Sequence, residues 1–274
     1  MHESVLKDGE VLLLALNVSN VDGQFLNTAR AIISDDENLR LNRFRFPNDK
    51  NLYAAARLLQ YFGLYRTLGR MPEQIEIVAA AKGKPQLVKP NLSSAAKSFD
   101  FNLSHSGSWA IAVFSTNRIG VDIERCDRKN DVIAIAKHYF FEQELDDLLS
   151  EGECARDKFF DLWTLKESYM KARGDGLSLG LSNFGFIRDP NHPNGYRLIC
   201  SETLNDNDAN WMFKTVSPDK QHRLSLANNR SSSSELSIVA EQCLLVDHST
   251  ALTNTLDEFF SSISFKPLSW FEEK

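Results

Sequence analysis

The sequence predicts an α+β protein made of two similar units packed side by side. Each half of the chain combines a long helix with flanking short strands, although no repeat at the sequence level proves the likeness. A length of 274 residues suits one or two domains, and 42% hydrophobic side chains can supply their cores. We expect a first unit over residues 1–118, a second over 119–229 and a C-terminal extension over 230–274.

In the first half, the clearest element is a helix that starts at Pro47 and ends near Gly69. Its apolar residues recur at helical spacing, and a proline at the start and a glycine at the end are typical of helix boundaries. Apolar runs bounded by turn residues predict the strands of a small antiparallel sheet, at residues 11–18, 75–79, 101–103 and 109–114.

The second half repeats this plan more loosely. A strand at 120–124 is followed by a helical region at 132–149, a charged linker at 151–157 and a long helix at 158–172, which Gly174 ends. Further strands are expected at residues 184–187, 196–199, 211–216 and 223–226.

The extension opens with a serine run at residues 231–234, which reads as a linker. Aromatic side chains are too frequent beyond it for a disordered tail, so we expect them to pack back on the body, with docking of a partner as the alternative. These aromatic residues are Phe259, Phe260, Phe265, Trp270 and Phe271.

Charge and cysteine usage narrow the class of protein. The formal net charge of −6 argues against nucleic acid as the main partner. The four cysteines lie far apart, as expected of reduced thiols in a cytoplasmic protein. The apolar run at residues 11–16 is too short to cross a membrane, and the acidic residues before it do not suit a secretory signal.

Two segments carry the strongest chemical signal. Asp122 and Glu124 alternate with apolar residues, so a strand would present both carboxylates on one face. Glu167 and Lys171 lie one helical turn apart and share a face of the second long helix. Three convergent carboxylates suit Mg²⁺, and a lysine beside them suits a phosphate, which points to metal-assisted chemistry on a phosphate ester. The alternative is a solvated strand face and an ordinary helix ion pair.

Two further segments carry polar groups that could bind phosphate. Residues 102–107 place His105 between two serines, Ser104 and Ser106, directly after a strand. Residues 82–85 read Lys-Gly-Lys-Pro and offer two cations around a flexible glycine. Taken alone, His105 is more often a structural turn residue, and a Lys-Gly-Lys-Pro segment is more often a plain surface turn.

Together these segments resemble the two-domain 4′-phosphopantetheinyl transferases, of the kind that activates surfactin synthetase. The motifs stand in the family's order and at similar spacing, and the resemblance runs from about Arg40 to Leu226. They are Lys84-Pro85, Phe101-Asn102-Leu103-Ser104-His105-Ser106-Gly107, Gly120-Val121-Asp122-Ile123-Glu124, Phe160-x-x-Trp163-x-x-Lys166-Glu167-Ser168-x-x-Lys171 and Gly174-x-Gly176-Leu177-Ser178-Leu179.

The resemblance implies a monomer with a pseudo-two-fold axis that binds coenzyme A between its halves. By this similarity Asp122, Glu124 and Glu167 would hold Mg²⁺ against the diphosphate of coenzyme A, so that Asp122 also belongs to the cofactor site. Glu167, Lys171 and Asp122 would be the catalytic residues. Glu167 is the candidate for the base that takes the proton of the attacking hydroxyl, directly or through a metal-bound water.

The resemblance also assigns contacts to coenzyme A. Lys84 and Ser104 would touch the nucleotide and its phosphates, His105 the 3′-phosphate, and Lys171 or Lys166 the diphosphate.

The chain departs from the family at one rim of this pocket. Asn51 and Leu52 stand about where a basic residue is usual early in the long helix. Lys50 or Arg57 are the candidates to replace it, and Arg40 matches another basic position of the same pocket.

The implied reaction moves phosphopantetheine to a serine hydroxyl of an apo carrier protein, whose pathway the sequence does not identify. Carrier domains commonly present an acidic helix, so a basic patch at Arg125, Arg128 and Lys129 is the expected docking element. Two alternatives stay open, a Mg²⁺-dependent phosphohydrolase and an inactive module that binds coenzyme A or a carrier.

Overall fold

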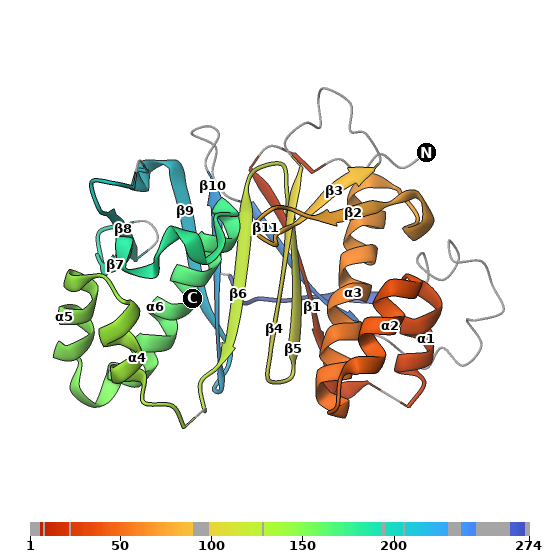
Figure 1. Cartoon of the computed structure of the whole chain (residues 1–274), viewed down its shortest axis with the longest axis horizontal. Helices are drawn as coiled ribbons and strands as arrows, with labels where there is room; N and C mark the ends of the chain where they lie inside the picture. The colour runs from red at the N-terminus through yellow and green to blue at the C-terminus, as the bar shows by residue number, and fades with distance from the viewer. Residues whose placement is uncertain are drawn as a thin grey trace.

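The computed structural model of the chain describes residues 6–7, 9–21, 23–89, 99–127, 129–192, 195–204, 206–229, 237–244 and 264–271. Figure 1 shows two halves, each with its helices on the outside and its strands toward the middle of the molecule. The predicted α+β class with a long helix in each half is confirmed. Within the described ranges, no helix has both the length and the apolar character needed to cross a membrane.

The first half is built on a five-stranded sheet with the strand order β12-β11-β1-β5-β4. A separate hairpin of β2 and β3 stands beside it. The elements of this half are α1 (Phe25–Ile32), α2 (Asp35–Arg43), α3 (Pro47–Leu68), β1 (Glu10–Asn17), β2 (Glu76–Ala79), β3 (Pro85–Lys89), β4 (Asp100–Ser106) and β5 (Trp109–Ser115), together with β11 (Ser237–Leu244) and β12 (Ser264–Pro267) from the extension.

The second half contains a three-stranded sheet with the order β6-β10-β9 and a hairpin of β7 and β8. Its elements are β6 (Ile119–Arg125), α4 (Val132–Tyr139), α5 (Glu142–Ser150), α6 (Ala155–Arg173), β7 (Phe184–Arg188), β8 (Tyr196–Cys200), β9 (Trp211–Asp219) and β10 (His222–Asn229). Short 3-10 helices lie at Val18–Asn20, Pro72–Gln74, Gly152–Cys154, Gly176–Leu179, Leu181–Asn183 and Asp208–Asn210.

The helices differ from the sequence expectation in three places. The helical region expected at 132–149 is two helices, because Phe140 and Phe141 both adopt extended backbone between α4 and α5. Phe140 stacks on Phe159 of α6 at 5.4 Å, so burial of this ring outweighs continuation of the helix. The charged linker expected at 151–157 is mostly helical, and α1 and α2 were not expected at all.

Buried apolar side chains of the described residues form three clusters, which correspond to the layers of the molecule. One cluster lies between α3 and the five-stranded sheet, and a second surrounds α6. The third lies where the two sheets face each other and joins Leu13 and Val113 of the first half to Val121 and Leu226 of the second. The halves therefore share a core and are not merely tethered.

At the junction of the halves, β4 and β6 run side by side but belong to different sheets. Side chains of β4 take the place of backbone acceptors for the N–H groups of β6. The N–H of Ile119 donates to Asp100 at 2.9 Å, that of Val121 to Asn102 at 3.1 Å, that of Ile123 to Ser104 at 3.2 Å and that of Arg125 to Ser106 at 3.1 Å. We call these four contacts the side-chain seam.

The described part of the extension packs on the first half. β11 pairs with β1 in parallel, so this sheet is not wholly antiparallel as expected. Arg66 of α3 forms an ion pair with Glu241 of β11 and lies over the ring of Phe265 at 4.7 Å. Trp270 meets Trp109 edge-on at 5.1 Å. The expected serine linker and the aromatic residues 259 and 260 lie outside the described residues.

Gly120 of β6 gives a test of how closely α6 approaches the junction. A Cβ atom at Gly120 would lie 2.1 Å from the carbonyl oxygen of Ser168 and 2.4 Å from the nitrogen of Ala172. Both are helix backbone atoms that cannot rotate away. We expect Gly120→Ala to lower the free energy of unfolding by at least the ~1–3 kcal/mol typical of overpacking, as measured by urea denaturation. The control is Gly23→Ala, where a Cβ atom meets nothing within 4 Å, and an equal loss in both variants would contradict this packing.

Candidate active site

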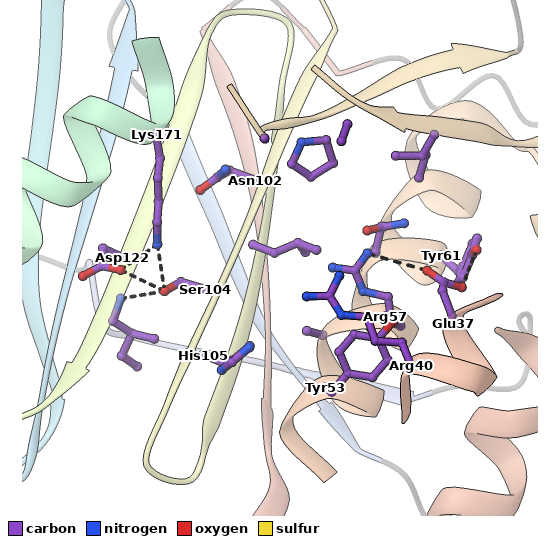
Figure 2. Close-up of a pocket in the computed structure, with 18 of the residues that line it drawn as sticks. Glu37, Arg40, Tyr53, Arg57, Tyr61, Asn102, Ser104, His105, Asp122 and Lys171 are labelled. Atoms are coloured by element: carbon purple, nitrogen blue, oxygen red, sulfur yellow. Dashed lines mark hydrogen bonds and ion pairs between the residues drawn. The ribbon is translucent and has the colours of Figure 1, made fainter. Parts of the chain in front are cut away.

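A cleft of about 880 Å³ lies between the two halves. Figure 2 shows one wall formed by β6 and α6, and the facing wall formed by α2 and α3. Of the residues singled out in the sequence, the cleft is lined by Arg40, Arg57, Ser104, His105, Asp122, Glu124, Glu167 and Lys171. The strand and the helix that carry the acidic motif therefore open into one space.

Asp122 is held from two sides at the junction. Lys171 donates a hydrogen bond to its Oδ1 at 2.7 Å, and the Ser104 hydroxyl donates to the same oxygen at 3.0 Å. The other oxygen, Oδ2, is buried and has no hydrogen-bond partner among the described residues. Asp122 thus keeps one carboxylate oxygen available for a ligand.

Glu124 is held in the same way, two residues further along β6. The Ser106 hydroxyl donates to its Oε2 at 3.0 Å while accepting the N–H of Arg125. Ser106 had no expected place in the site from the sequence. The available signal was the matching alternation of Ser104 and Ser106 with Asp122 and Glu124, which become opposite once β4 and β6 are neighbours.

Glu167 of α6 faces these two carboxylates. Burial raises the pKa of Glu167 to about 7, and the negative charges of Asp122 and Glu124 add to this rise while Lys171 opposes it. This arrangement holds more negative charge than Lys171 alone neutralises.

The donor set suits Mg²⁺, because it consists of carboxylate oxygens and includes the unpartnered Oδ2 of Asp122. Among the described residues, however, no three His, Cys, Asp or Glu side chains are gathered closely enough to hold a metal ion. In this arrangement Lys171 stands against Asp122 instead.

Lys84 lies outside the lining of the main cleft. Its ammonium donates to Asp100 at 2.5 Å, to the carbonyl of Ile119 at 3.0 Å and to that of Ala172 at 3.4 Å. Burial lowers the pKa of Lys84, while Asp100 opposes that shift. Lys84 therefore joins β4, β6 and α6, and it also lines a smaller pocket that Glu167 and Lys171 share. Its expected contact with the nucleotide stays a prediction.

Lys166 does not line the cleft. Its side chain is 0% exposed, with the ammonium 2.6 Å from Glu144 and 2.5 Å from the carbonyl oxygen of Phe184. One residue along a helix turns the side chain by about 100°, so Lys166 points into the core of the second half while Glu167 faces the cleft. A contact between Lys166 and coenzyme A does not fit this position.

The facing wall is basic and aromatic. Arg40 and Arg57 lie over the ring of Tyr53 at 5.5 and 5.6 Å, and Arg57 is 3.6 Å from Glu37. Glu37 also accepts the hydroxyl of Tyr61 at 2.9 Å (Figure 2). Glu37 was missed in the sequence because α2 was not expected. Tyr53 and Tyr61 lie on α3, which was expected, but helical spacing alone did not show that they line the cleft. Neither Lys50 nor Asn51 lines the cleft.

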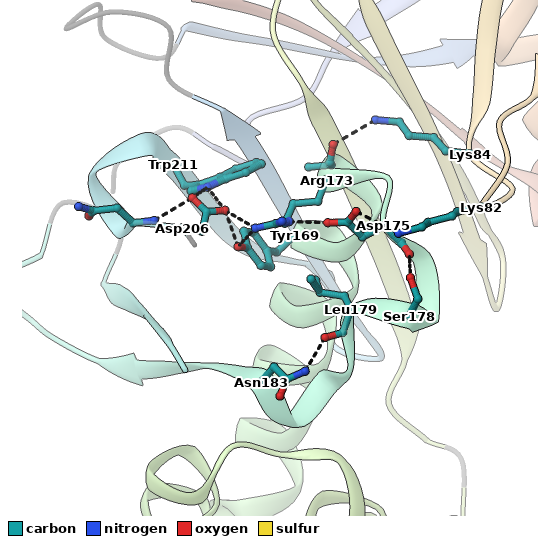
Figure 3. Close-up of polar contacts among 12 residues, drawn as sticks. Lys82, Lys84, Tyr169, Arg173, Asp175, Ser178, Leu179, Asn183, Asp206 and Trp211 are labelled. Atoms are coloured by element: carbon teal, nitrogen blue, oxygen red, sulfur yellow. Dashed lines mark hydrogen bonds and ion pairs between the residues drawn. The ribbon is translucent and has the colours of Figure 1, made fainter. Parts of the chain in front are cut away.

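A polar network fixes the C-terminal end of α6 (Figure 3). Asp206 accepts the hydroxyl of Tyr169 at 2.6 Å and pairs with Arg173 at 2.7 Å. Asp175 pairs with Arg173 at 2.7 Å and with Lys82 of the β2–β3 turn at 3.3 Å. The end of the helix that carries Glu167 and Lys171 is thereby linked to both halves.

Family comparisons agree with this architecture. A model described as the 4′-phosphopantetheinyl transferase superfamily matches residues 118–227, and one described as the N-terminal part of 4′-phosphopantetheinyl transferase matches residues 20–117.

Curated relatives match this chain over most of their own length. A putative 4′-phosphopantetheinyl transferase of Synechocystis is 34% identical over 197 residues, which cover 67% of this chain and 78% of the relative. The 4′-phosphopantetheinyl transferase HetI of Nostoc is 35% identical over 175 residues, covering 63% and 72%. Sfp of Bacillus subtilis is 30% identical over 197 residues, covering 72% and 82%. The chain therefore belongs to the 4′-phosphopantetheinyl transferase superfamily, as a transferase of the Sfp-like type.

Proposed function

We propose that this enzyme transfers the 4′-phosphopantetheine group of coenzyme A to a serine hydroxyl of an apo carrier protein, in a Mg²⁺-dependent reaction that releases 3′,5′-ADP. The observation that carries the proposal is that Asp122, Glu124, Glu167 and Lys171 line one cleft opposite Arg40 and Arg57. Carboxylates and a lysine on one wall suit a metal-bound diphosphate, and the cations opposite suit a further phosphate.

Asp122, Glu124 and Glu167 would hold the metal, which would offset the negative charge of the diphosphate when bound. Ser104 and Ser106 support this assignment because each donates a hydrogen bond to one of the strand carboxylates. Hydrogen bonds of this kind fix the orientation of metal ligands.

In the reaction, the serine oxygen of the carrier forms a bond to the phosphorus that bears pantetheine, and the bond from that phosphorus to 3′,5′-ADP breaks. The serine proton must leave as the new bond forms, since an alcohol is a weak nucleophile at neutral pH. Glu167 is our candidate acceptor for this proton because it is a carboxylate that lines the cleft beside Asp122 and Lys171. Lys171 would offset charge on the departing diphosphate oxygen.

Recognition of coenzyme A would use the facing wall. Arg57 would take the place of the usual basic residue and Arg40 would serve the other basic position, because both line the cleft and Lys50 does not. His105 is exposed at the same cleft and would read the 3′-phosphate, with Ser104 near the diphosphate.

The acceptor would dock next to β6. Arg125 is close to the strand that carries Asp122, where it pairs with Asp127 at 2.6 Å, and Lys129 is exposed. Arg128, the third member of the expected basic patch, lies outside the described residues.

We also propose that the enzyme works as a monomer in the cytoplasm, without nucleic acid or a membrane, which the free cysteines and the net charge of −6 favour.

The reaction itself is tested by intact-mass analysis of an apo carrier protein incubated with enzyme, coenzyme A and Mg²⁺. A gain of one phosphopantetheine group with formation of 3′,5′-ADP is the expected result. Release of phosphate without any change in the carrier would instead identify a phosphohydrolase.

Glu167→Gln separates the roles of base and metal ligand. The amide keeps the shape of the side chain but accepts no proton, so we expect the single-turnover rate to fall by about 10²–10⁴-fold while the affinity for coenzyme A falls much less. Glu142→Gln, on an exposed surface of α5, is the matched control. A Glu167→Gln enzyme that keeps its rate at higher Mg²⁺ would make Glu167 a metal ligand only.

Arg57→Ala tests the basic wall. Loss of one charged contact should weaken binding of coenzyme A by about tenfold or more, and should weaken dephospho-coenzyme A much less because it lacks the 3′-phosphate. Both affinities can be measured by titration calorimetry. Lys50→Ala is the matched control. If Arg57→Ala lowers the affinity for both ligands equally, Arg57 does not contact the 3′-phosphate of coenzyme A.

A further inference from the structure

Lys171 occupies a built site on the acidic wall. Its ammonium lies 2.7 Å from Oδ1 of Asp122, 3.2 Å from the hydroxyl of Ser104 and 3.1 Å from the carbonyl oxygen of Val121. An ammonium has three N–H donors, so each one has an acceptor at this position. The side chain of Asp122 is 7% exposed and that of Lys171 is 27% exposed, so this ion pair is largely shielded from solvent.

The same wall holds further carboxylate oxygens. Oδ2 of Asp122 is buried without a hydrogen-bond partner among the described residues, while Glu124 and Glu167 line the same cleft. These carboxylates could hold a divalent cation, yet no metal-binding group of three is assembled among the described side chains. Lys171 is the one cation that the described contacts place directly on Asp122, as Figure 2 shows.

We propose that Lys171 holds the place of the divalent cation on Asp122 in the free enzyme, and that the diphosphate of coenzyme A draws it away. Mg²⁺ and coenzyme A would then bind cooperatively through this single side chain. The inference rests on the proposed function and adds how the binding of Mg²⁺ and of coenzyme A would be coupled.

The chemistry of lysine suits such a transfer. A lysine is a compact charge on a flexible four-carbon stem, so the ammonium can move several ångströms while the helix stays in place. A diphosphate offers it oxygens with greater total negative charge than one carboxylate does. While Lys171 stays on Asp122, it competes with a cation for Oδ1 and lowers the affinity of the free enzyme for Mg²⁺. Linkage then requires coenzyme A and Mg²⁺ to raise each other's affinity by the same factor.

A simpler origin of cooperativity must be separated from this one. The diphosphate oxygens could themselves become ligands of the metal, which would couple the two ligands even if Lys171 never moved. The two explanations differ in what happens when Lys171 loses its charge. Lys171→Met keeps most of the stem and removes the ammonium, so it should abolish the competition but leave the diphosphate oxygens unchanged.

The experiment is calorimetric titration of Mg²⁺ into the free enzyme and into the enzyme saturated with coenzyme A. We expect the free Lys171→Met enzyme to bind Mg²⁺ about tenfold more tightly than the free unaltered enzyme does. The coupling factor, which is the ratio of the Mg²⁺ affinities with and without coenzyme A, should shrink by a similar amount. Titration of coenzyme A with and without Mg²⁺ must give the same coupling factor.

Arg57→Met is the matched control, because Arg57 is a cation that lines the same cleft but pairs with Glu37 on the facing wall. This variant reports the general change in the electrostatic field. The proposal is overturned if Lys171→Met tightens Mg²⁺ no more than Arg57→Met, or leaves the coupling factor unchanged. Circular dichroism and thermal unfolding check the fold of each variant, and Lys171→Gln replaces Lys171→Met if the latter does not fold.

Failure of this inference is distinguishable from failure of the proposed function. The unaltered enzyme is assayed separately for the mass gain of an apo carrier protein. If the carrier is modified but the coupling factor is unchanged in Lys171→Met, only the role of Lys171 as a placeholder is rejected. If the coupling depends on Lys171 but no carrier is modified, the transferase reaction is rejected and the role of Lys171 as a placeholder is retained.

Discussion

The side-chain seam between β4 and β6 is the contact on which the rest of the molecule depends. A backbone ladder would join the two sheets with no side chain involved, whereas here Asn102, Ser104 and Ser106 supply the acceptors for β6. Carbonyl oxygens of β6 at the seam accept hydrogen bonds from the ammonium groups of Lys84 and Lys171. The seam thus joins the halves and orders the polar groups of the cleft at the same time.

The seam also explains how negative charges can lie close together in a folded protein. The hydroxyl groups of Ser104 and Ser106 each accept a hydrogen bond from a backbone N–H and donate one to a carboxylate. These hydrogen bonds compensate Asp122 and Glu124 for part of the hydration that they lose on burial. Glu167 comes from a separate element, α6, and has no such donor in the described contacts, which fits the rise of its pKa. Strand and helix therefore contribute carboxylates with different electrostatic surroundings to one cleft.

Much of this arrangement could be predicted from periodicity, because the acidic strand and the second long helix each have one face toward the cleft. The sequence did not show that Lys166 is buried, since its partner Glu144 lies 22 residues away on α5 and no local pattern reports the pairing. It also failed to predict α1 and α2, which are short, so Glu37 and its hydrogen bond from Tyr61 of α3 were missed. The split between α4 and α5 depends on tertiary burial of Phe140, which overrides local helix preference.

The parallel pairing of β11 with β1 has a consequence for synthesis of the chain. Strand β1 is made first, but its neighbour β11 lies more than 200 residues later, beyond the entire second half. Ribosomes release domains in N-to-C order, so an N-terminal unit ordinarily completes its fold before the next one emerges. Here the sheet of the first half keeps an open edge until Ser237–Leu244 leaves the ribosome, while the second half already has all of its strands. The half translated second is therefore the first that can close its sheets, and the nascent first half carries an exposed strand edge throughout that interval.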